Sequence, residues 1–428
     1  MSRWFIVVLI ILFQFSLASH YAIPTFSFFF VEDYHWTALQ TTSVWSAVQV
    51  AVGLAPLMSS VLLRFISNRF LTHISSILIF LGFFISSWNG GFSFPLVLLG
   101  QGVLVGTAIG LSYIVTLNVA NSYFPERPGL ATGICIGSYG SASLMYALIA
   151  EFFLRRTSPG FVFKLFSLIS SIGVFVCGLF MNPIDIQSNE PIKNDCESPV
   201  ISQDFSPVVP AFTTVAQEAP TPKLPSKLSF ISSIFFWKLF FIVFSGVFAG
   251  LLCISALRIF PSVVMKRKGF NDEEIIRLTF IATGVLLNFG NGLGRLFMGV
   301  VVDFLGPFRV LYLAILLQGI LVLVFAFFSH LSLILFLSAL LIPTLYGAVY
   351  VALPVIVVKV FRKELFSVVF PCLFFASAVS GILGPSLFGL LFDKELYVLS
   401  FLMTSFLLFM TFFVAYDLQR VKDSVLPV

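Results

Sequence analysis

Residues 308–328 read FRVLYLAILLQGILVLVFAFF, a run in which Arg309 is the only charged side chain. An α-helix rises about 1.5 Å per residue, so a run of about 20 apolar residues can cross the hydrocarbon core of a bilayer. We therefore predict that these residues form a membrane-spanning helix.

The whole chain shares this apolar character. Of its 428 residues, 59% are hydrophobic and 10% are charged, and the mean hydropathy is +1.05. A soluble domain carries roughly 25% charged residues, because charge solvates its surface. The composition therefore excludes a soluble enzyme and indicates an all-α integral membrane protein with twelve transmembrane helices. Their expected positions are 4–30, 39–62, 71–88, 94–120, 130–153, 162–182, 233–263, 276–300, 308–328, 331–358, 367–391 and 396–416.

The first six runs correspond to the last six at a constant offset of about 237 residues. Tyr113 and Phe124, near the end of the fourth run, correspond to Tyr350 and Phe361 in the tenth. A repeat of this kind predicts two six-helix halves of the same topology, with a cavity at the seam between them.

The expected domains follow from the runs and from the stretch between them. Residues 1–182 form the first half and 230–416 the second half. Residues 183–229 are rich in Pro, Ser, Thr and acids, which predicts a disordered linker. An even number of spans puts both termini on one side, and the Lys and Arg content of the loops favours the cytoplasm. The linker and the tail over 417–428 are then cytoplasmic.

The N-terminus resembles a secretory signal peptide, because Arg3 precedes an apolar run and then Ser16 to Ser19. The apolar character resumes from Ile23 to Val31, however, and the repeat needs this segment. We therefore expect it to be retained as the first helix.

The eighth run holds the densest group of polar residues, NFGNGLGR over 288–295. Asn288, Asn291 and Arg295 are three and four residues apart, so an α-helix places them on one face. Polar groups in hydrocarbon are costly, so that face should point between the halves rather than at lipid. The small residues Gly290, Gly292 and Gly294 allow another helix to approach closely.

Two interpretations of Arg295 remain open at this stage. Its fork of donors suits a carboxylate or another anion in a transport pathway. The alternative is that Arg295 braces the end of the helix, because it is followed at regular spacing by Gly299 and Asp303. For Asp303 we favour a bracing role.

Two longer motifs carry a family resemblance. Residues 294–306 read GRLFMGVVVDFLG and resemble the signature of the major facilitator superfamily between its eighth and ninth spans. Residues 121–133 read NSYFPERPGLATG and are similar to the corresponding region of monocarboxylate and oxalate/formate porters. The resemblance implies a transporter that works by alternating access. It also implies gating or bracing roles for Gly294, Gly299, Asp303 and Arg127.

The sequence departs from proton-coupled monocarboxylate porters at two positions. Those porters have an Asp four residues before the Arg of the eighth span, where this chain has Asn291. They have a Lys after the Pro of the first span, where this chain has Thr25 after Pro24. No Asp or Glu lies in the middle of a predicted span. We therefore expect a uniporter or exchanger rather than a proton-driven carrier.

Further candidates for substrate contact are Arg258, Tyr113, Tyr139 and Thr25. Arg258 lies in the outer part of the seventh span, where it could attract anions to the mouth or extend to the headgroups. The tyrosines could bind substrate or only join helices by hydrogen bonds. For His20 in the first span we expect an ordinary packing or solvated role. Two embedded cations without an embedded carboxylate favour an anionic substrate.

The sequence thus predicts a secondary transporter of a small organic anion, monocarboxylates first. The alternatives are a facilitator of amino acids or other neutral solutes, and a sensor or scaffold with a transporter fold. No pattern indicates an enzyme, a cofactor or a metal site, and the basic residues lie in loops rather than in a nucleic-acid-binding patch. The expected partners are the substrate and the bilayer, with an unidentified accessory membrane protein left open. The plasma membrane is favoured over an organelle.

Overall fold

The computed structural model describes residues 3–23, 25–26, 30, 34–154, 156–182, 229–257, 259–361 and 365–425. Within these residues lie twelve helices that are long and apolar enough to cross a membrane. This confirms the predicted fold class. The helices of the first half are α1 (Arg3–Leu17) continued by the 3₁₀ segment η1 (Ala18–Ala22), α3 (Ala38–Leu62), α4 (Asn68–Ser86), α5 (Phe94–Val97) joined through the π-helical η3 (Leu98–Val105) to α6 (Gly106–Tyr123), α7 (Pro128–Leu154) and α8 (Pro159–Gly178).

The second half begins after a short 3₁₀ turn, η5 (Ser229–Ser232), and follows the same order. Its eighth membrane helix is a continuous run of five helical segments from Asp272 to Leu305. The elements are α9 (Ile234–Ala256), α10 (Ile259–Arg267), α11 (Asp272–Phe280), η6 (Ile281–Leu286), α12 (Leu287–Phe289), η7 (Gly290–Gly294), α13 (Arg295–Leu305), α14 (Pro307–Phe328), α15 (Ser332–Phe361), α16 (Phe366–Asp393) and α17 (Tyr397–Val425).

Helix starts follow from local sequence. Thr37 and Gln40 form a capping box at the start of α3, in which each side chain accepts a hydrogen bond from the other residue's backbone N–H. Asn271 caps α11, whose first turn carries three acidic residues. Helix α13 ends at Gly306, whose φ of +86° is unfavourable for residues that carry a Cβ.

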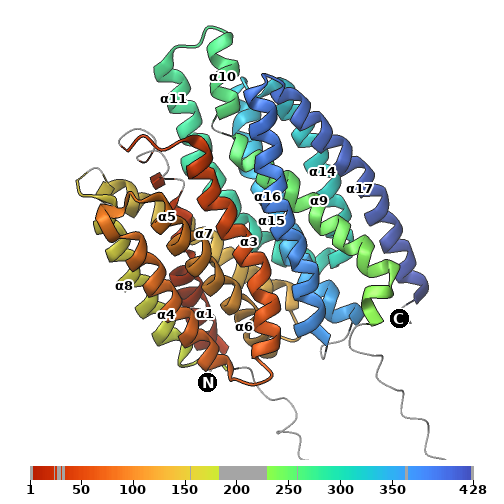
Figure 1. Ribbon diagram of the computed structural model, residues 1–428. Helices are drawn as coiled ribbons and strands as arrows, with labels where there is room; N and C mark the ends of the chain where they lie inside the picture. Colours follow the sequence, from red (N-terminus) through yellow and green to blue (C-terminus); the bar gives the residue numbers. More distant parts are fainter. Residues whose placement is uncertain are drawn as a thin grey trace, which may run out of the picture.

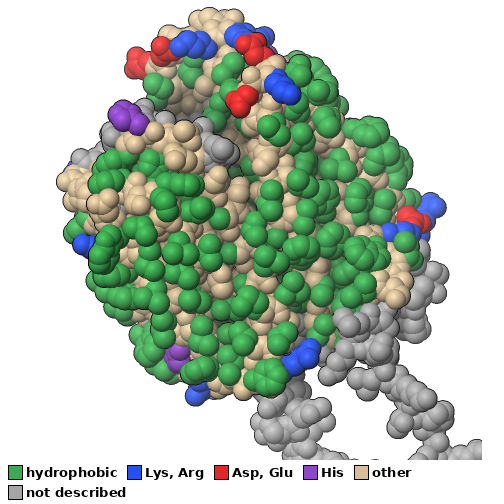
Figure 2. Space-filling view, in the orientation of Figure 1, with side chains coloured by type: hydrophobic (Ala, Val, Ile, Leu, Met, Phe, Trp, Pro, Cys, Tyr) green, Lys and Arg blue, Asp and Glu red, His purple; other side chains and the backbone are tan. Residues whose placement is uncertain are grey.

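The outer surface matches a lipid environment. Large apolar side chains such as Phe304 (87% exposed) and Phe65 (80% exposed) lie on it. Figure 2 shows a broad hydrophobic face with charged side chains gathered toward its two ends. The chain is therefore a multi-pass membrane protein.

The two halves lie side by side in Figure 1, the first from red to yellow and the second from green to blue. The start of α1 and the end of α17 lie on one face, which we call the terminal face; α10 and α11 project from the opposite face. Between the halves, α3 packs against α16 and α7 packs against α13, η7 and α15. These helix pairs form the central interface.

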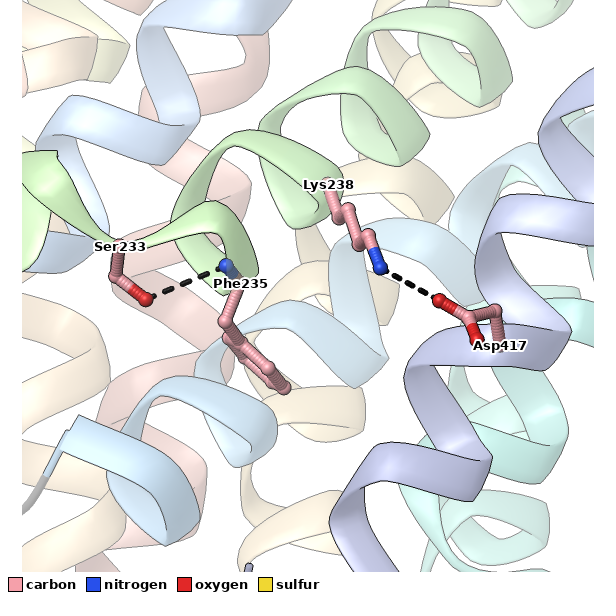
Figure 3. A network of polar contacts seen from close by, with 4 residues as sticks. All are labelled: Ser233, Phe235, Lys238 and Asp417. Carbon is pink, nitrogen blue, oxygen red and sulfur yellow. Dashed lines mark hydrogen bonds and ion pairs between the residues drawn. The ribbon is translucent and has the colours of Figure 1, made fainter.

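The predicted linker, 183–229, lies outside the described residues except for Ser229. Helix α17 continues beyond the expected end of the last span at residue 416 and ends at Val425. On this extension Asp417 accepts a hydrogen bond from Lys238 Nζ of α9 at 2.5 Å (Figure 3). Ser233 caps the same end of α9 by accepting from the Phe235 N–H at 3.3 Å.

Candidate functional site

Arg295 is the first residue of α13 and is 2% exposed. Its guanidinium carbon lies 5.2 Å from the ring centre of Tyr346 and 5.6 Å from that of Tyr350, both on α15. A cation over aromatic faces is stabilised by the ring quadrupole, more strongly where water is excluded. Gly347 lies between these tyrosines, and a Cβ there would collide with the Arg295 side chain. The sequence of α15 thus provides the space that Arg295 occupies.

Several buried polar atoms at this point have no hydrogen-bond partner among the described residues. They are Nε and one terminal nitrogen of Arg295, together with Oδ1 of Asn291. Among the residues that the structure describes, no carboxylate forms an ion pair with Arg295. A buried charge is costly unless it is paired and hydrogen-bonded. The two unpaired nitrogens of Arg295 therefore offer donors and positive charge suited to an anion, whereas Oδ1 of Asn291 offers an acceptor.

Aromatic side chains from both halves connect to the two tyrosines that contact the guanidinium. Tyr113 of α6 and Phe374 of α16 have ring centres 4.9 Å apart, and Phe374 lies 5.5 Å from Tyr350. The hydroxyl groups of Tyr113, Tyr346 and Tyr350 lie within electrostatic range of Arg295. These rings join α6 of the first half to α15 and α16 of the second half.

A second group of aromatic residues belongs to the first half. Tyr139 of α7 and His20 of η1 are joined at 3.2 Å between Oη and Nε2. The His20 ring also stacks on Trp45 of α3, with 5.8 Å between ring centres, and contacts Tyr21 at 4.4 Å. Tyr139 and Tyr21 lie within electrostatic range of Arg295. The structure thus brings together Arg295, Asn291, Tyr113 and Tyr139 of the predicted substrate-contact residues.

Other predicted substrate-contact residues are placed differently. Asn288 is held by its own helix, because its amide nitrogen donates to Gly284 O at 2.9 Å. Its Oδ1 accepts from the Ser143 hydroxyl of α7 at 2.6 Å, so Asn288 links the two halves. Thr25 is partly exposed near the first span, and Arg258 lies outside the described residues.

Asn288 lies on the side of the eighth helix that faces α7, as does the backbone of Asn291. Ser143 of α7 contacts Asn288, and a Cβ at Gly140 would collide with Asn291 O. This contact continues along the helix although η6 and η7 on either side of α12 are π-helical. Asn291 and Arg295 are buried, at 4% and 2% exposure, while Asn288 is only partly buried.

The residues expected to brace the helix ends lie where α13 crosses the start of α7. The two oxygens of Asp303 accept from the backbone N–H groups of Gly129 and Leu130, at 2.8 and 2.7 Å. A carboxylate at a helix N-terminus is stabilised by the unpaired N–H groups and by the helix dipole. Asp303 therefore fastens the two halves together near the terminal face.

Three further residues of the bracing group lie at or near these helix contacts. Gly299 packs against Gly129 and Gly133 of α7, and Gly294 packs against Thr344 of α15. A Cβ at Gly299 would lie 2.7 Å from Gly129 O, so larger residues do not fit without movement. Arg127 is exposed in the loop before α7, and its carbonyl oxygen accepts from Ala131 N at 3.0 Å.

The loop that precedes α7 also holds an ion pair on the terminal face. Arg3 at the start of α1 pairs with Glu126. A backbone hydrogen bond within Glu126 lowers the pKa of its carboxyl below the ordinary value, and the bond and charge of Arg3 lower it further. This pair lies within the first half, on the terminal face, and is separate from the residues around Arg295.

The sequence interpretation did not place His20, Tyr21 and Trp45 beside Tyr139. His20 is 1% exposed and lies in the short 3₁₀ segment that follows α1. The available signal was a polar and aromatic triplet, Ser19 to Tyr21, inside an otherwise apolar span. Its meaning depended on which residues of α3 and α7 lie opposite, and the sequence does not give that information.

Comparison with known proteins agrees with this architecture. Residues 5–385 match the Major Facilitator Superfamily. The chain is 30% identical over 148 residues to the uncharacterized MFS-type transporter YhjX of Escherichia coli strain K12, covering 35% of this chain and 36% of that protein. It is 25% identical over 212 residues to the oxalate:formate antiporter of Oxalobacter formigenes, covering 48% and 41%. The matched regions thus span well under half of these relatives.

Solved structures show the same fold at low sequence identity. The transporter FucP in its outward conformation superposes with a TM-score of 0.65 at 14% identity, covering 96% of this chain and 98% of that one. The nucleoside transporter NupG superposes with a TM-score of 0.62 at 12% identity, covering 97% and 100%. With its twelve membrane helices, its central interface and a match across most of its length, the chain belongs to the major facilitator superfamily of transporters.

Proposed function

We propose that the protein is a secondary transporter of small organic anions, monocarboxylates first, that works as a uniporter or exchanger in the plasma membrane. The observation that carries the proposal is the buried guanidinium of Arg295, which has unpaired donors and no ion pair within the described part of the chain. A carboxylate would supply both the missing acceptors and the compensating charge. The similarity to an oxalate:formate antiporter supports the same chemical class.

The location of Arg295 supports alternating access. The connected aromatic rings beside Arg295 come from α6 in one half and from α15 and α16 in the other. A ligand bound at Arg295 would therefore lie between the two halves. Movement of one half against the other would then open the site to each side in turn. Asp303, which joins α13 to α7, would hold the terminal face closed in one of the two states.

The absence of an acid at position 291 supports exchange or uniport over proton coupling. Asn291 does not take up or release a proton in the physiological range, and no carboxylate within the described residues pairs with Arg295. The positive charge of Arg295 would neutralise the charge of an anion bound there. Transport of that anion then requires no proton at this site.

The test uses the purified full chain in liposomes with radiolabelled formate, acetate, lactate and oxalate. We expect uptake of at least one acid that is accelerated by the unlabelled acid inside or that equilibrates without a pH gradient. Arg295→Ala should reduce uptake at least tenfold, because charged hydrogen bonds contribute about 1.5–3 kcal/mol. Arg295→Lys should retain part of the activity, since it keeps the charge and loses the fork.

The matched control is Arg277→Ala, which removes an exposed Arg from α11. Size-exclusion chromatography of each variant separates loss of transport from loss of folding. Concentration of a monocarboxylate driven only by an imposed pH gradient would contradict the uniport or exchange mechanism. Transport of neutral solutes alone would contradict the anionic substrate, and no transport of any tested solute would favour a sensor or scaffold.

A further inference from the structure

The first membrane helix changes from α to 3₁₀ geometry at Ala18, and His20 lies in that short segment. Interrupted membrane helices commonly form binding sites in transporters, because their irregular backbone is tolerated only where it faces protein or a cavity. His20 is 1% exposed and is held on three sides by aromatic rings, those of Tyr21, Trp45 and Tyr139. Its ring orientation is therefore set by packing.

The contact between His20 and Tyr139 leaves hydrogen-bonding capacity unused. Nε2 of His20 and Oη of Tyr139 share one hydrogen bond at 3.2 Å, and among polar groups within the described residues the imidazole otherwise meets only the backbone of Leu17, without a hydrogen bond of regular geometry at Nδ1. A neutral imidazole has one donor and one acceptor nitrogen, and a phenol oxygen can both donate and accept. The pair can therefore bind a hydroxyl or a carbonyl oxygen.

Tyr139 connects this pair to the charged part of the site. It lies against His20. The next residue of α7, Gly140, packs on Asn291, four residues before Arg295, and a Cβ at Gly140 would collide with Asn291 O. His20, Tyr139 and Trp45 belong to the first half, whereas Arg295 and its two flanking tyrosines belong to the second. The candidate site thus has a cationic side chain, Arg295, on the second half and two uncharged polar side chains, His20 and Tyr139, on the first half.

We propose that His20, together with Tyr139, determines specificity by binding an uncharged oxygen of a carboxylate substrate whose carboxylate lies at Arg295. The substrate class is then a short carboxylate with a hydroxyl or oxo group, in preference to the same acid without it. This inference rests on the proposed function. A site that offers buried polar groups discriminates against a ligand that leaves them unpaired.

The test compares propionate, lactate and pyruvate, which have the same carbon number and one carboxylate but differ in the oxygen at the second carbon. Each is used to inhibit uptake of radiolabelled lactate by the reconstituted protein. We expect lactate and pyruvate to inhibit about 3- to 10-fold better than propionate, the range for one neutral hydrogen bond. His20→Leu and Tyr139→Phe should bring these ratios close to one, and His20→Gln should preserve part of them.

The matched control is His73→Leu, because His73 packs on Phe175 between α4 and α8, away from the central interface. A purely structural role of His20 would change total uptake without changing the ratios. Tyr139→Phe removes a single oxygen atom. If His20→Leu does not fold, the inhibition ratios measured on Tyr139→Phe test the inference instead. Equal inhibition by all three acids in the wild type, or unchanged ratios in active variants, would overturn the inference. If no carboxylate inhibits or is transported, the proposed function itself fails.

Discussion

At the scale of single residues, the structure separates two roles that the sequence left open. Arg295 lies among aromatic rings at the interface of the halves and forms no ion pair with a described carboxylate, which favours a ligand contact over bracing. Asp303, eight residues further along the same helix, accepts two backbone N–H groups from α7. Both charged residues lie on α13, but Arg295 contacts α15 and Asp303 contacts α7.

Replacement of Asp303 should loosen the contact between α13 and α7. Asp303→Asn removes the negative charge and one acceptor oxygen at a helix N-terminus, where such a charge contributes about 0.3–1 kcal/mol at an exposed site and up to about 2 when partly buried. We expect faster maleimide labelling of a Leu296→Cys reporter, because Leu296 packs on Gly137 across this interface.

The matched control for this experiment is Asp393→Asn, which alters an exposed carboxylate at the end of α16. It should leave the labelling rate of the reporter unchanged. Equal labelling in the Asp303→Asn variant and in the parent would show that Asp303 does not restrain the interface.

At the scale of elements, α7 is built to pack closely against its partner in the other half. Gly129, Gly133, Gly137 and Gly140 recur at intervals of three or four residues and face α13 and η7. Small residues at this spacing allow helix backbones in a membrane to approach each other and to move without large side chains in the way. The same helix carries Tyr139 into the central cluster.

Enlarging one of these glycines should therefore reduce both stability and transport. A Cβ at Gly133 would lie 3.0 Å from Gly299 Cα, so Gly133→Leu forces the helices apart. Overpacking of this kind costs about 1–3 kcal/mol. We expect a lower melting temperature in detergent and uptake below half of the wild-type rate.

Gly389→Leu is the control, since a Cβ at Gly389 has no atom within 4 Å among its surroundings. It should leave both the melting temperature and uptake near those of the parent. A Gly133→Leu protein with wild-type uptake would show that the α7–α13 spacing is not needed for transport.

At the scale of the whole molecule, two sets of helix contacts join the halves, and transport requires that they change. Besides α7 with α13, α3 packs on α16, where a Cβ at Gly381 would lie 2.7 Å from the Cβ of Gln49. Contacts within each half, such as α4 with α8, have no such requirement. The fold therefore predicts different consequences of cross-linking between the halves and within one half.

A disulfide between Gln49→Cys and Gly381→Cys should stop uptake when oxidised and restore it on reduction. The control pair, Thr72→Cys and Gly178→Cys, joins α4 to α8 within the first half, where a Cβ at Gly178 would lie 3.1 Å from the Thr72 Cβ. Oxidation of this pair should leave uptake intact. Undiminished uptake after complete oxidation of the first pair would argue against alternating access.

The sequence by itself determined the number, order and position of the membrane helices and the presence of Arg295 in the eighth span. Apolar length and the repeat are local or regularly spaced properties, so they can be read along the chain. It also pointed to Asp303 as a brace, because Asp303 follows Arg295 and Gly299 at the regular spacing of a loop-bracing motif.

Only the tertiary structure decided which residues form the candidate site. His20, Trp45 and Tyr139 come from η1, α3 and α7 and meet through packing within the first half. They approach Arg295 of α13 because the two halves pack across the central interface. The structure also showed that Asn288 is occupied by hydrogen bonds to Gly284 of its own helix and to Ser143 of α7. Sequence spacing predicts neighbours along one regular helix, whereas a binding site depends on the side chains that other helices bring opposite.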